Sequence, residues 1–266
     1  MATSGSSFYK PTDEDKAKYK DMLVVVITPC GSYDNKFQFT KSLANMISYS
    51  WANGLRIGAF GGTERMVIHW ARQDLAKQAK ELKSAEGERY THILWLDDDH
   101  VFNPDLLCCL ARNADKDVVS ALYYGRDKAL PVVYVKDKNP DKYTHYPLIW
   151  PPDYFCEVDA IGFGACLMRM DVLDRMPEPW FQFTKCGEDI YFCVHAKEAG
   201  IRIWLDGSYK LGHIGAPHIV GYTDWQDYVK VHEKEFGPKI KVGLGGRDVE
   251  MAVPQRDDGI LEKVNG

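Results

Sequence analysis

Three consecutive carboxylates are the residues of this chain best suited to chemistry. Asp97, Asp98 and Asp99, followed by His100, end the apolar run 92–96. Such a run predicts a buried strand, and open α/β sheets bind ligands beyond the carboxyl ends of their strands. Neighbouring acids repel one another unless a cation lies between them, and oxygen ligands suit Mg²⁺ or Mn²⁺. The pattern therefore favours a divalent-metal site over the simpler alternative, in which one acid caps the next helix.

Two later segments carry further candidates. Glu188 and Asp189 follow Gly187 at the start of a predicted helix, where acids stabilise the helix dipole by roughly 0.3–1 kcal/mol and need no other role. The functional alternative is a carboxylate that faces a cleft and accepts a proton from an attacking hydroxyl. His213 lies between small residues and is a candidate to complete the coordination of a metal, with His218 as the competing histidine.

A glycine-rich segment and one arginine are open to two interpretations each. The segment 162–164, Gly-Phe-Gly, predicts a bulge or a close-packing site within a strand, or else room for a sugar ring beside the metal. Arg72, in the predicted helix 67–82, is either a helix-surface residue or a contact to a phosphate and a base. The chain contains neither of the glycine-rich motifs that cradle nucleotide phosphates.

Composition limits the class of protein. The 266 residues are 45% hydrophobic and 27% charged, which is ordinary for a globular chain with a sizeable core. A net charge of -5 excludes an overall electropositive clamp for nucleic acid, although a local basic patch remains compatible with it. No stretch approaches the roughly 20 apolar residues that span a bilayer, so no membrane partner is expected. Seven cysteines without a Cys-x-x-Cys pair argue against a zinc knuckle or a disulfide scaffold and favour the cytoplasm.

The order of elements predicts an α/β fold. In the first half, strands alternate with helices, which indicates a parallel sheet with helices on its faces and a Rossmann-like unit. The expected strands are 23–27, 55–60, 92–96 and 117–124, and the expected helices are 37–51, 67–82 and 104–113. The second half is less regular, with strands expected at 131–136, 157–170, 201–205 and 209–213, helices at 187–200 and 224–236, and a loop at 143–154. We expect one domain at 22–236, between a polar, solvated lead-in at 1–21 and a loosely packed tail at 237–266.

Taken together, the ordered motifs resemble nucleotide-sugar glycosyltransferases of the GT-A fold, especially the family 2-like branch. The matching pieces lie within about 22–215 and are Val24-Val25-Val26-Ile27-Thr28-Pro29, Leu96-Asp97-Asp98-Asp99, Gly162-Phe163-Gly164-Ala165-Cys166-Leu167-Met168-Arg169, Gly187-Glu188-Asp189 and Gly212-His213. The resemblance implies a single GT-A domain with a mostly parallel central sheet and an irregular acceptor-side second half. It also implies Mn²⁺ or Mg²⁺ and a nucleotide-sugar donor, for which a UDP-sugar is the prior expectation.

Roles for individual residues follow from the same resemblance. The donor-site residues it implies are Thr28 and Pro29 in the nucleoside pocket, Arg72 near the base or diphosphate, Asp97 at the ribose or a metal-bound water, and Asp98 and Gly164 beside the donor. It implies Asp99, Asp97 and His213 as metal ligands, Asp189 as the general base, and Glu188 as a residue that positions acceptor or donor. The triple aspartate permits two registers of the motif, either Asp97 with Asp99 or Asp98 with His100.

With one base and no second carboxylate at a nucleophile position, we expect a single displacement that inverts the anomeric carbon. Segments 65–75, 97–102 and 123–126 also resemble bacteriophage-carried glycosyltransferases, some of them similar to enzymes that place sugars on hydroxymethylated pyrimidines in DNA. If the chain is phage-encoded, the host cytoplasm is its expected location. The residues offered for a DNA acceptor are Arg126, Lys128, Lys136 and Lys138, amid Tyr123, Tyr124, Tyr134 and Tyr143, which could bind phosphates and stack a flipped base. A solvated strand pair with ordinary aromatic packing explains the same residues.

Two other functions compete. A sugar nucleotidyltransferase also places metal-binding acids after a Rossmann-like strand, but a glycine-rich, basic loop is expected after its first strand. The segment 28–32, Thr-Pro-Cys-Gly-Ser, lacks that loop. A non-catalytic nucleotide-sugar or carbohydrate-binding module is the third candidate. The presence of both acid pairs and the late histidine argues against it.

Overall fold

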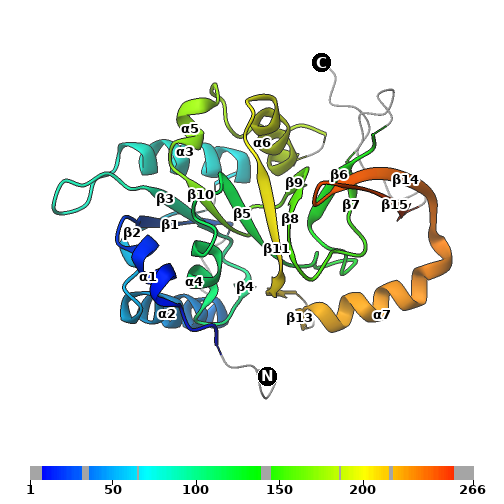
Figure 1. The fold of residues 1–266 in the computed structure, drawn as a ribbon, viewed down its shortest axis with the longest axis horizontal. Helices are drawn as coiled ribbons and strands as arrows, with labels where there is room; N and C mark the ends of the chain where they lie inside the picture. The colour runs from blue at the N-terminus through cyan, green and yellow to red at the C-terminus, as the bar shows by residue number, and fades with distance from the viewer. Residues whose placement is uncertain are drawn as a thin grey trace.

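A seven-stranded sheet forms the centre of the molecule (Figure 1). The computed structural model describes residues 8–31, 36–64, 66–138, 145–185, 187–215 and 218–254. Only β8 and β10 run against the other strands of this sheet, which confirms the predicted α/β fold with a mostly parallel centre. The order across the sheet is β2 (Arg56–Glu64), β1 (Leu23–Cys30), β3 (His92–Leu96), β10 (Ala165–Arg169), β5 (Val118–Leu122), β11 (Ile203–Lys210) and β8 (Phe155–Val158).

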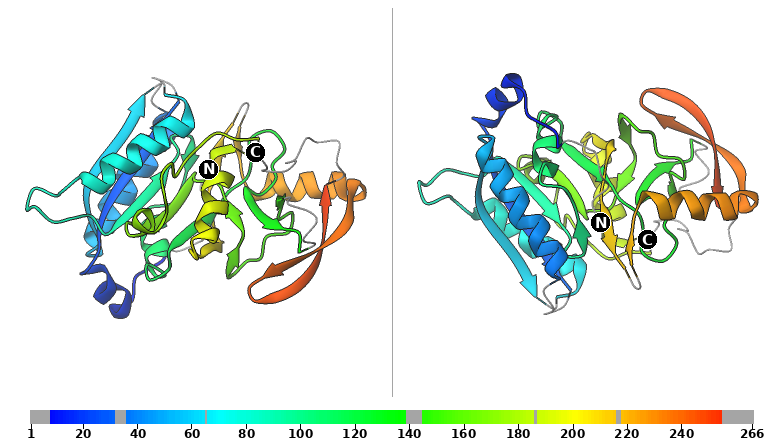
Figure 2. Two further views of the ribbon diagram at one scale, coloured as in Figure 1. Left: turned by 90° about the horizontal axis from the view of Figure 1, so that it is seen from above. Right: turned by 90° about the horizontal axis from the view of Figure 1, so that it is seen from below.

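Helices cover both faces of this sheet, and they separate into two groups (Figures 1 and 2). One face packs against α3 (Ile68–Glu81), α5 (Val172–Arg175) and α6 (Gly187–Glu198). The other face packs against α1 (Asp13–Tyr19), α2 (Phe37–Ala52) and α4 (Leu106–Ala111). The molecule is therefore a three-layer arrangement in which the sheet is shielded from water on both sides.

Strand β1 shows why the sequence folds this way. Leu23, Val25 and Ile27 point into the hydrophobic cluster on the α3 side. Val24 and Val26 point into the cluster on the α2 side, and all five side chains are buried. An uninterrupted β-branched run is what a parallel strand with two covered faces requires. The carboxyl ends of β1 and its parallel neighbour β3 are thereby held at one edge of the sheet.

Two small sheets extend the core. The first joins β4 (His100–Val101) to β12 (Gly212–Ile214), which in turn pairs with β13 (Ile219–Val220). In this ladder His213 lies opposite His100, so residues far apart in sequence meet beside the acid cluster. The second small sheet consists of β7 (His145–Pro147), β6 (Val133–Lys136) and β9 (Ala160–Ile161).

The expectation of a loosely packed C-terminal tail is wrong for the part of it that the structure describes. After α7 (Tyr222–His232) and the short helix η1 (Glu233–Glu235), the chain forms a hairpin of β14 (Phe236–Leu244) and β15 (Arg247–Pro254). Ile240, Val242 and Val253 are buried and belong to the main hydrophobic cluster. Their alternation with polar residues gives the hairpin one apolar face, which packs on the core. Residues 255–266 lie outside the described residues.

The N-terminal lead-in is also more ordered than its composition suggests. Residues 13–19 form α1, whose first turn is closed by a capping box between Thr12 and Asp15. Tyr19 is fully buried, and its hydroxyl donates to the carbonyl oxygen of Cys108 at 3.0 Å. This single aromatic anchor attaches an otherwise polar helix to α4. Across the described residues, no helix has the length and apolar character needed to cross a bilayer.

Candidate active site

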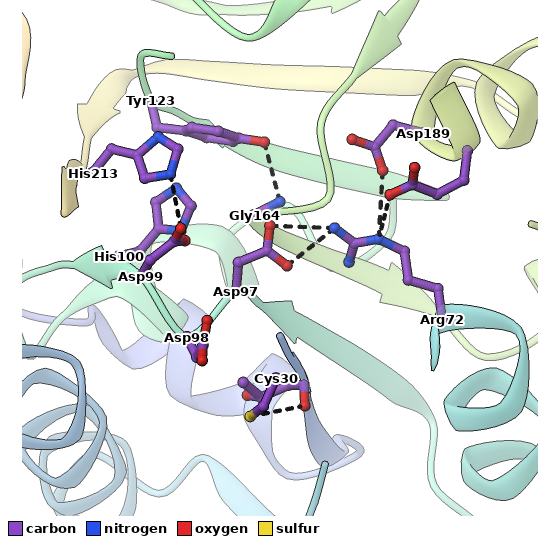
Figure 3. A network of polar contacts seen from close by, with 12 residues as sticks. Cys30, Arg72, Asp97, Asp98, Asp99, His100, Tyr123, Gly164, Asp189 and His213 are labelled. Carbon is purple, nitrogen blue, oxygen red and sulfur yellow. Dashed lines mark hydrogen bonds and ion pairs between the residues drawn. The ribbon is translucent and has the colours of Figure 1, made fainter. Parts of the chain in front are cut away.

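A cavity of about 440 Å³ opens where β1 and β3 end and where α3 and α6 begin. Charged residues that lie far apart in the sequence line this cavity. Its carboxylates are Asp97, Asp98, Asp99, Glu188 and Asp189, and its cations are Lys36, Arg72 and Arg126. The two predicted acid motifs therefore share one cavity, as Figure 3 shows for most of these side chains.

Arg72 links the two acid motifs. It projects from α3, and its side chain is only 2% exposed. Its Nη2 donates to both carboxylate oxygens of Asp97, at 3.0 and 3.2 Å (Figure 3). Its Nε donates to Oε1 of Glu188 at 3.2 Å. Oδ1 of Asp189 lies 3.5 Å from the same Nε. The guanidinium also packs over two aromatic rings of the core, so it cannot move away from these acids easily.

The charges of this cluster change its acid–base properties. Burial lowers the pKa of Arg72, but attraction to Asp97, Asp189 and Glu188 outweighs burial, so its pKa is raised and it stays charged. Burial raises the pKa of Asp189 well above its usual value, and the negative charges of Glu188 and Asp97 add to this while Arg72 opposes it. Asp189 is consequently a stronger base than an exposed aspartate, which suits a proton acceptor.

Asp99 belongs to a second cluster, built with two histidines. Its Oδ2 lies 3.2 Å from Nε2 of His213, and its Oδ1 lies 3.3 Å from Nδ1 of His100. The three side chains offer ligand atoms that all lie within 4.8 Å of one another. Nδ1 of His213 lies 2.8 Å from the carbonyl oxygen of Tyr124, and this contact fixes the ring with Nε2 towards Asp99.

The buried histidine of this cluster has unmet hydrogen-bonding capacity. His100 is fully buried, and neither of its ring nitrogens makes a hydrogen bond within the described part of the chain. Its ring stacks on His213 at a centroid distance of 4.5 Å and meets the edge of Tyr123. Burial raises the pKa of Asp99, but the contacts with His100 and His213 outweigh it and lower the pKa below its usual range. One ionised carboxylate and two imidazoles of this kind fit a divalent cation.

Asp97 and Asp98 lie apart from this cluster. The carboxylate of Asp97 turns to Arg72, so Asp97 and Asp99 do not share one ion in the geometry seen here (Figure 3). Oδ1 of Asp98 lies 3.5 Å from Nζ of Lys36, and burial raises the pKa of Asp98. Neither predicted register of the motif is reproduced as a pair. The cluster instead combines Asp99 from one register with His100 from the other.

Two of the predicted donor-site residues lie behind the cavity wall. Pro29 lines the cavity, but Thr28 is fully buried and does not. Gly164 does not line it either. A Cβ at Gly164 would come within 2.6 Å of His100 and 2.8 Å of Tyr123, so the glycine makes room for these rings and not for a sugar. Neither residue lines the cavity in this structure, and direct contact of Thr28 or Gly164 with a donor stays a prediction.

The basic and aromatic stretch proposed for DNA is divided by the fold. Tyr123 and Tyr124 are buried in the core, which removes them as stacking surfaces for a base. Arg126 instead reaches the cavity, where its Nη1 lies 3.1 Å from Oδ2 of Asp99. Lys138 pairs with Asp248 of the C-terminal hairpin. Tyr143 lies outside the described residues.

Sequence reasoning missed Lys36 altogether. The signal for it was a cation after the first strand, directly before the helix that starts at Phe37. The sequence indicates His100 only through the second register, and the burial of His100 beside His213 depends on the pairing of β4 with β12. Such long-range strand pairing cannot be inferred from local spacing.

Comparisons with known proteins give likenesses of fold only. No protein-family model matches the chain, and no curated protein matches it. Among solved structures, the protein A197 from STIV is 21% identical, with a TM-score of 0.49 over 73% of this chain and 86% of that one. GalNAc-T7 with UDP, GalNAc and Mn²⁺ is 13% identical, with a TM-score of 0.43 over 79% of this chain, which spans only 48% of that one.

A third structure is similar over almost its whole length. It is glucosyl-3-phosphoglycerate synthase from Mycobacterium tuberculosis in complex with Mn²⁺, UDP and phosphoglyceric acid. It is 11% identical, with a TM-score of 0.42 over 93% of each chain. Since all these scores are below 0.5, the function proposed below takes its support from the side chains of the cavity and from the sequence motifs.

Proposed function

We propose that this chain is a metal-dependent, inverting glycosyltransferase that moves a sugar from a nucleotide-diphosphate donor, in the first instance a UDP-sugar, to an acceptor hydroxyl. The observation that carries the proposal is the shared cavity. One side of it holds Asp99 of the candidate metal cluster, and the other side holds Asp189, a carboxylate with a raised pKa. A site that combines a cation position with a proton acceptor is what displacement of a diphosphate by an alcohol requires.

The candidate metal ligands are Asp99, His100 and His213. These residues would hold a divalent cation, whose positive charge would offset the negative charge of the departing diphosphate. With two imidazoles beside one carboxylate, the ligand set favours Mn²⁺ over Mg²⁺, which prefers oxygen ligands. Lys36 and Arg126 line the same cavity and add positive charge for the phosphates.

The proposed transfer is one displacement. The carboxylate of Asp189 accepts the proton of the acceptor hydroxyl as its oxygen forms a bond to the anomeric carbon. The bond from that carbon to the diphosphate oxygen breaks, and the electron pair leaves with the nucleoside diphosphate. Because attack and departure occur on opposite faces of the sugar, the anomeric configuration inverts. Arg72 acts as a positioning residue, since its ion pairs hold Asp189 and Glu188 beside Asp97.

The experiment that tests the proposal incubates the protein with a panel of UDP-sugars and a panel of acceptors, with Mn²⁺ or EDTA, and follows release of UDP. We expect metal-dependent release that falls by about 10²–10⁴-fold in Asp189→Asn, the usual contribution of a general base. UDP binding should persist in that variant, because Asp189 does not contact the donor diphosphate in this proposal. Retention of the anomeric configuration in the product would contradict the role given to Asp189.

The same experiment separates the competing functions. A sugar nucleotidyltransferase would release pyrophosphate from a nucleoside triphosphate and a sugar 1-phosphate, and it would not release UDP from a UDP-sugar. A binding module would bind UDP equally well in the wild type and in Asp189→Asn, and it would turn over neither substrate. Hydroxymethylcytosine DNA belongs in the acceptor panel as a test of the DNA-base hypothesis. In this fold Tyr123 and Tyr124 are buried, so they cannot stack on a flipped base.

A further inference from the structure

Two exposed aromatic rings and the half-buried ring of His69 lie on two segments that lead into the cavity, the start of α3 and the approach to α6. Trp70, at the start of α3, is 62% exposed, and Phe183, in the segment before α6, is 64% exposed. The ring of His69 lies between them, with its centroid 5.2 Å from Trp70 and 5.9 Å from Phe183. Large apolar side chains gathered at the surface and bordering a cleft commonly mark a binding site. We call these three residues the aromatic row.

The aromatic row is held in place by buried contacts. Oε1 of Gln73 on α3 accepts hydrogen bonds from the backbone N–H groups of Trp180 and Phe181, at 2.8 and 3.0 Å. Both of these side chains are buried, which fixes the backbone from which Phe183 projects. The exposed position of the Phe183 ring is therefore set by the fold, and a ligand would meet a preorganised surface.

The row adjoins the acceptor side of the proposed reaction. Ile68, which directly precedes His69, lines the cavity, and so does Asp189. The ion pairs of Arg72 with Glu188 and Asp189 join α3 to α6, and the contact of His69 with Phe183 joins the same two segments. The contact of His69 with Phe183 thus lies between the two segments that carry Ile68 and Asp189 to the cavity.

The charge of this surface selects the kind of molecule. Residues 66–71 and 179–184 contain no lysine, arginine, aspartate or glutamate, and Glu178 is paired with Lys77. A polyanion such as DNA obtains most of its affinity from many cations, and the described residues that flank these two segments add one exposed cation, Lys185. A pyranose ring offers an apolar C–H face to an aromatic ring and hydroxyls at its edge. It therefore matches both the row and the adjacent proton acceptor.

We propose that the aromatic row is the acceptor platform of this enzyme and that the acceptor is a saccharide, whose ring stacks on Trp70 and Phe183 while a hydroxyl faces Asp189. This inference rests on the proposed function, and it specifies its acceptor class. Trp70 and Phe183 then set acceptor affinity, and they leave donor binding to the cavity itself.

The test uses the full-length protein with UDP and Mn²⁺ on a microarray that carries saccharides, peptides and hydroxymethylcytosine DNA. We expect the wild type to bind saccharides, and Trp70→Ala and Phe183→Ala to weaken that binding by about tenfold or more each. Trp51→Ala is the matched control, because Trp51 is an equally prominent tryptophan, 55% exposed, on α2. Trp70→Phe should recover part of the binding, and thermal unfolding should show that every variant folds.

Several outcomes would overturn the inference. The first is that the wild type binds peptides or DNA and no saccharide. The second is that neither alanine variant weakens saccharide binding. The third is that Trp51→Ala weakens saccharide binding as much as the other two variants do. UDP affinity and hydrolysis of the UDP-sugar by water are measured on the same proteins. If the wild type lacks both, the proposed function fails. If both persist while the array gives one of the results above, the acceptor platform alone is refuted.

Discussion

Four consecutive residues supply two clusters that differ in how their negative charge is balanced. Asp97 joins Glu188 and Asp189 around Arg72, whose side chain is buried and whose raised pKa keeps it charged. Asp99 faces His100 and His213, which carry charge only when protonated, and Arg126, which is 53% exposed. The Arg72 cluster thus contains a permanent buried cation, whereas the Asp99 cluster does not.

The difference indicates a division of work. A cation that is part of the chain holds its carboxylates in one geometry, as a proton acceptor at a fixed position requires. A carboxylate that faces imidazoles can exchange protons for a metal ion, as a site that must bind and release a metal–diphosphate complex requires. The comparison predicts that changes in the Arg72 cluster act on folding stability and turnover together. Changes in the Asp99 cluster should act on metal affinity with a smaller effect on stability.

The largest effect is expected for Arg72→Ala. Removing the guanidinium leaves Asp97, Glu188 and Asp189 facing one another in a partly buried site without their cation. Removal of one partner from a buried ion pair typically costs about 3–5 kcal/mol. The free energy of unfolding, measured by urea denaturation, should fall by this amount, and Arg72→Lys should recover only part of it because lysine lacks the planar fork.

Lys80→Ala is the matched control for that variant. Lys80 lies on the same helix and pairs with Asp174 near the surface, where its side chain is 36% exposed. An ion pair of this kind contributes about 0–1 kcal/mol. If Arg72→Ala proved no more destabilising than Lys80→Ala, the view of Arg72 as the fixed charge of the site would be wrong.

Loss of metal affinity is the next effect in size. Asp99→Asn and His213→Ala each remove one ligand from the candidate cluster, and we expect Mn²⁺ affinity to fall by at least about tenfold in calorimetric titrations. Treating the wild type with EDTA should abolish release of UDP while it shifts the melting temperature little. Asp97→Asn provides the contrast, because that residue is held by Arg72. An equal loss of Mn²⁺ affinity in Asp97→Asn would show that Asp97 and Asp99 bind the same ion and that the two clusters are one.

The sequence predicted this cavity well in parts and poorly in others. The central strands, the acid triplet and the α6 acids follow from local patterns, since a β-branched run and a polar stop are visible within ten residues. The sequence indicates Arg72 as a candidate but does not indicate its partners, because they depend on how α3 packs against α6. An arginine is equally suited to binding a phosphate and to pairing with carboxylates, so the residue type alone could not distinguish these two roles.

The two ends of the chain show the same limit. Residues 13–19 are polar except for a few positions, yet the buried ring of Tyr19 and the Thr12 cap hold them as a helix. The hairpin β14–β15 alternates apolar and polar residues, although the sequence analysis predicts a tail for this segment. The alternation is weak, and it predicts a hairpin only when the core surface that the hairpin covers is known. The proposed domain boundaries therefore stay predictions.

A smaller effect concerns Asp189 and pH. Its folded pKa is raised above the unfolded value of 3.8, through burial and the nearby charges of Glu188 and Asp97, against the opposing charge of Arg72. Between 3.8 and the raised value, the folded state binds more protons than the unfolded state, so stability falls as pH rises. Asp189→Asn should remove this loss and gain about 1 kcal/mol in unfolding free energy at neutral pH. Urea denaturation at a series of pH values should show the gain vanish towards low pH, and a gain that persisted there would contradict this account.

The smallest effect, and the sharpest test of an exchangeable cation, is expected for Arg126. Its Nη1 lies 3.1 Å from Oδ2 of Asp99, the same oxygen that lies 3.2 Å from Nε2 of His213. A metal at this oxygen would compete with the guanidinium, and a displaced guanidinium would be free to meet the diphosphate. Because a half-exposed ion pair contributes roughly 0.2–1 kcal/mol, Arg126→Ala should raise affinity for Mn²⁺ alone by about two- to fivefold. The same variant should bind UDP in the presence of Mn²⁺ more weakly, whereas Lys128→Ala, which removes an equal charge two residues along, should change neither titration. If Arg126→Ala instead lowered Mn²⁺ affinity without UDP, the guanidinium would be a permanent part of the Asp99 cluster, and the contrast with the Arg72 cluster would be lost.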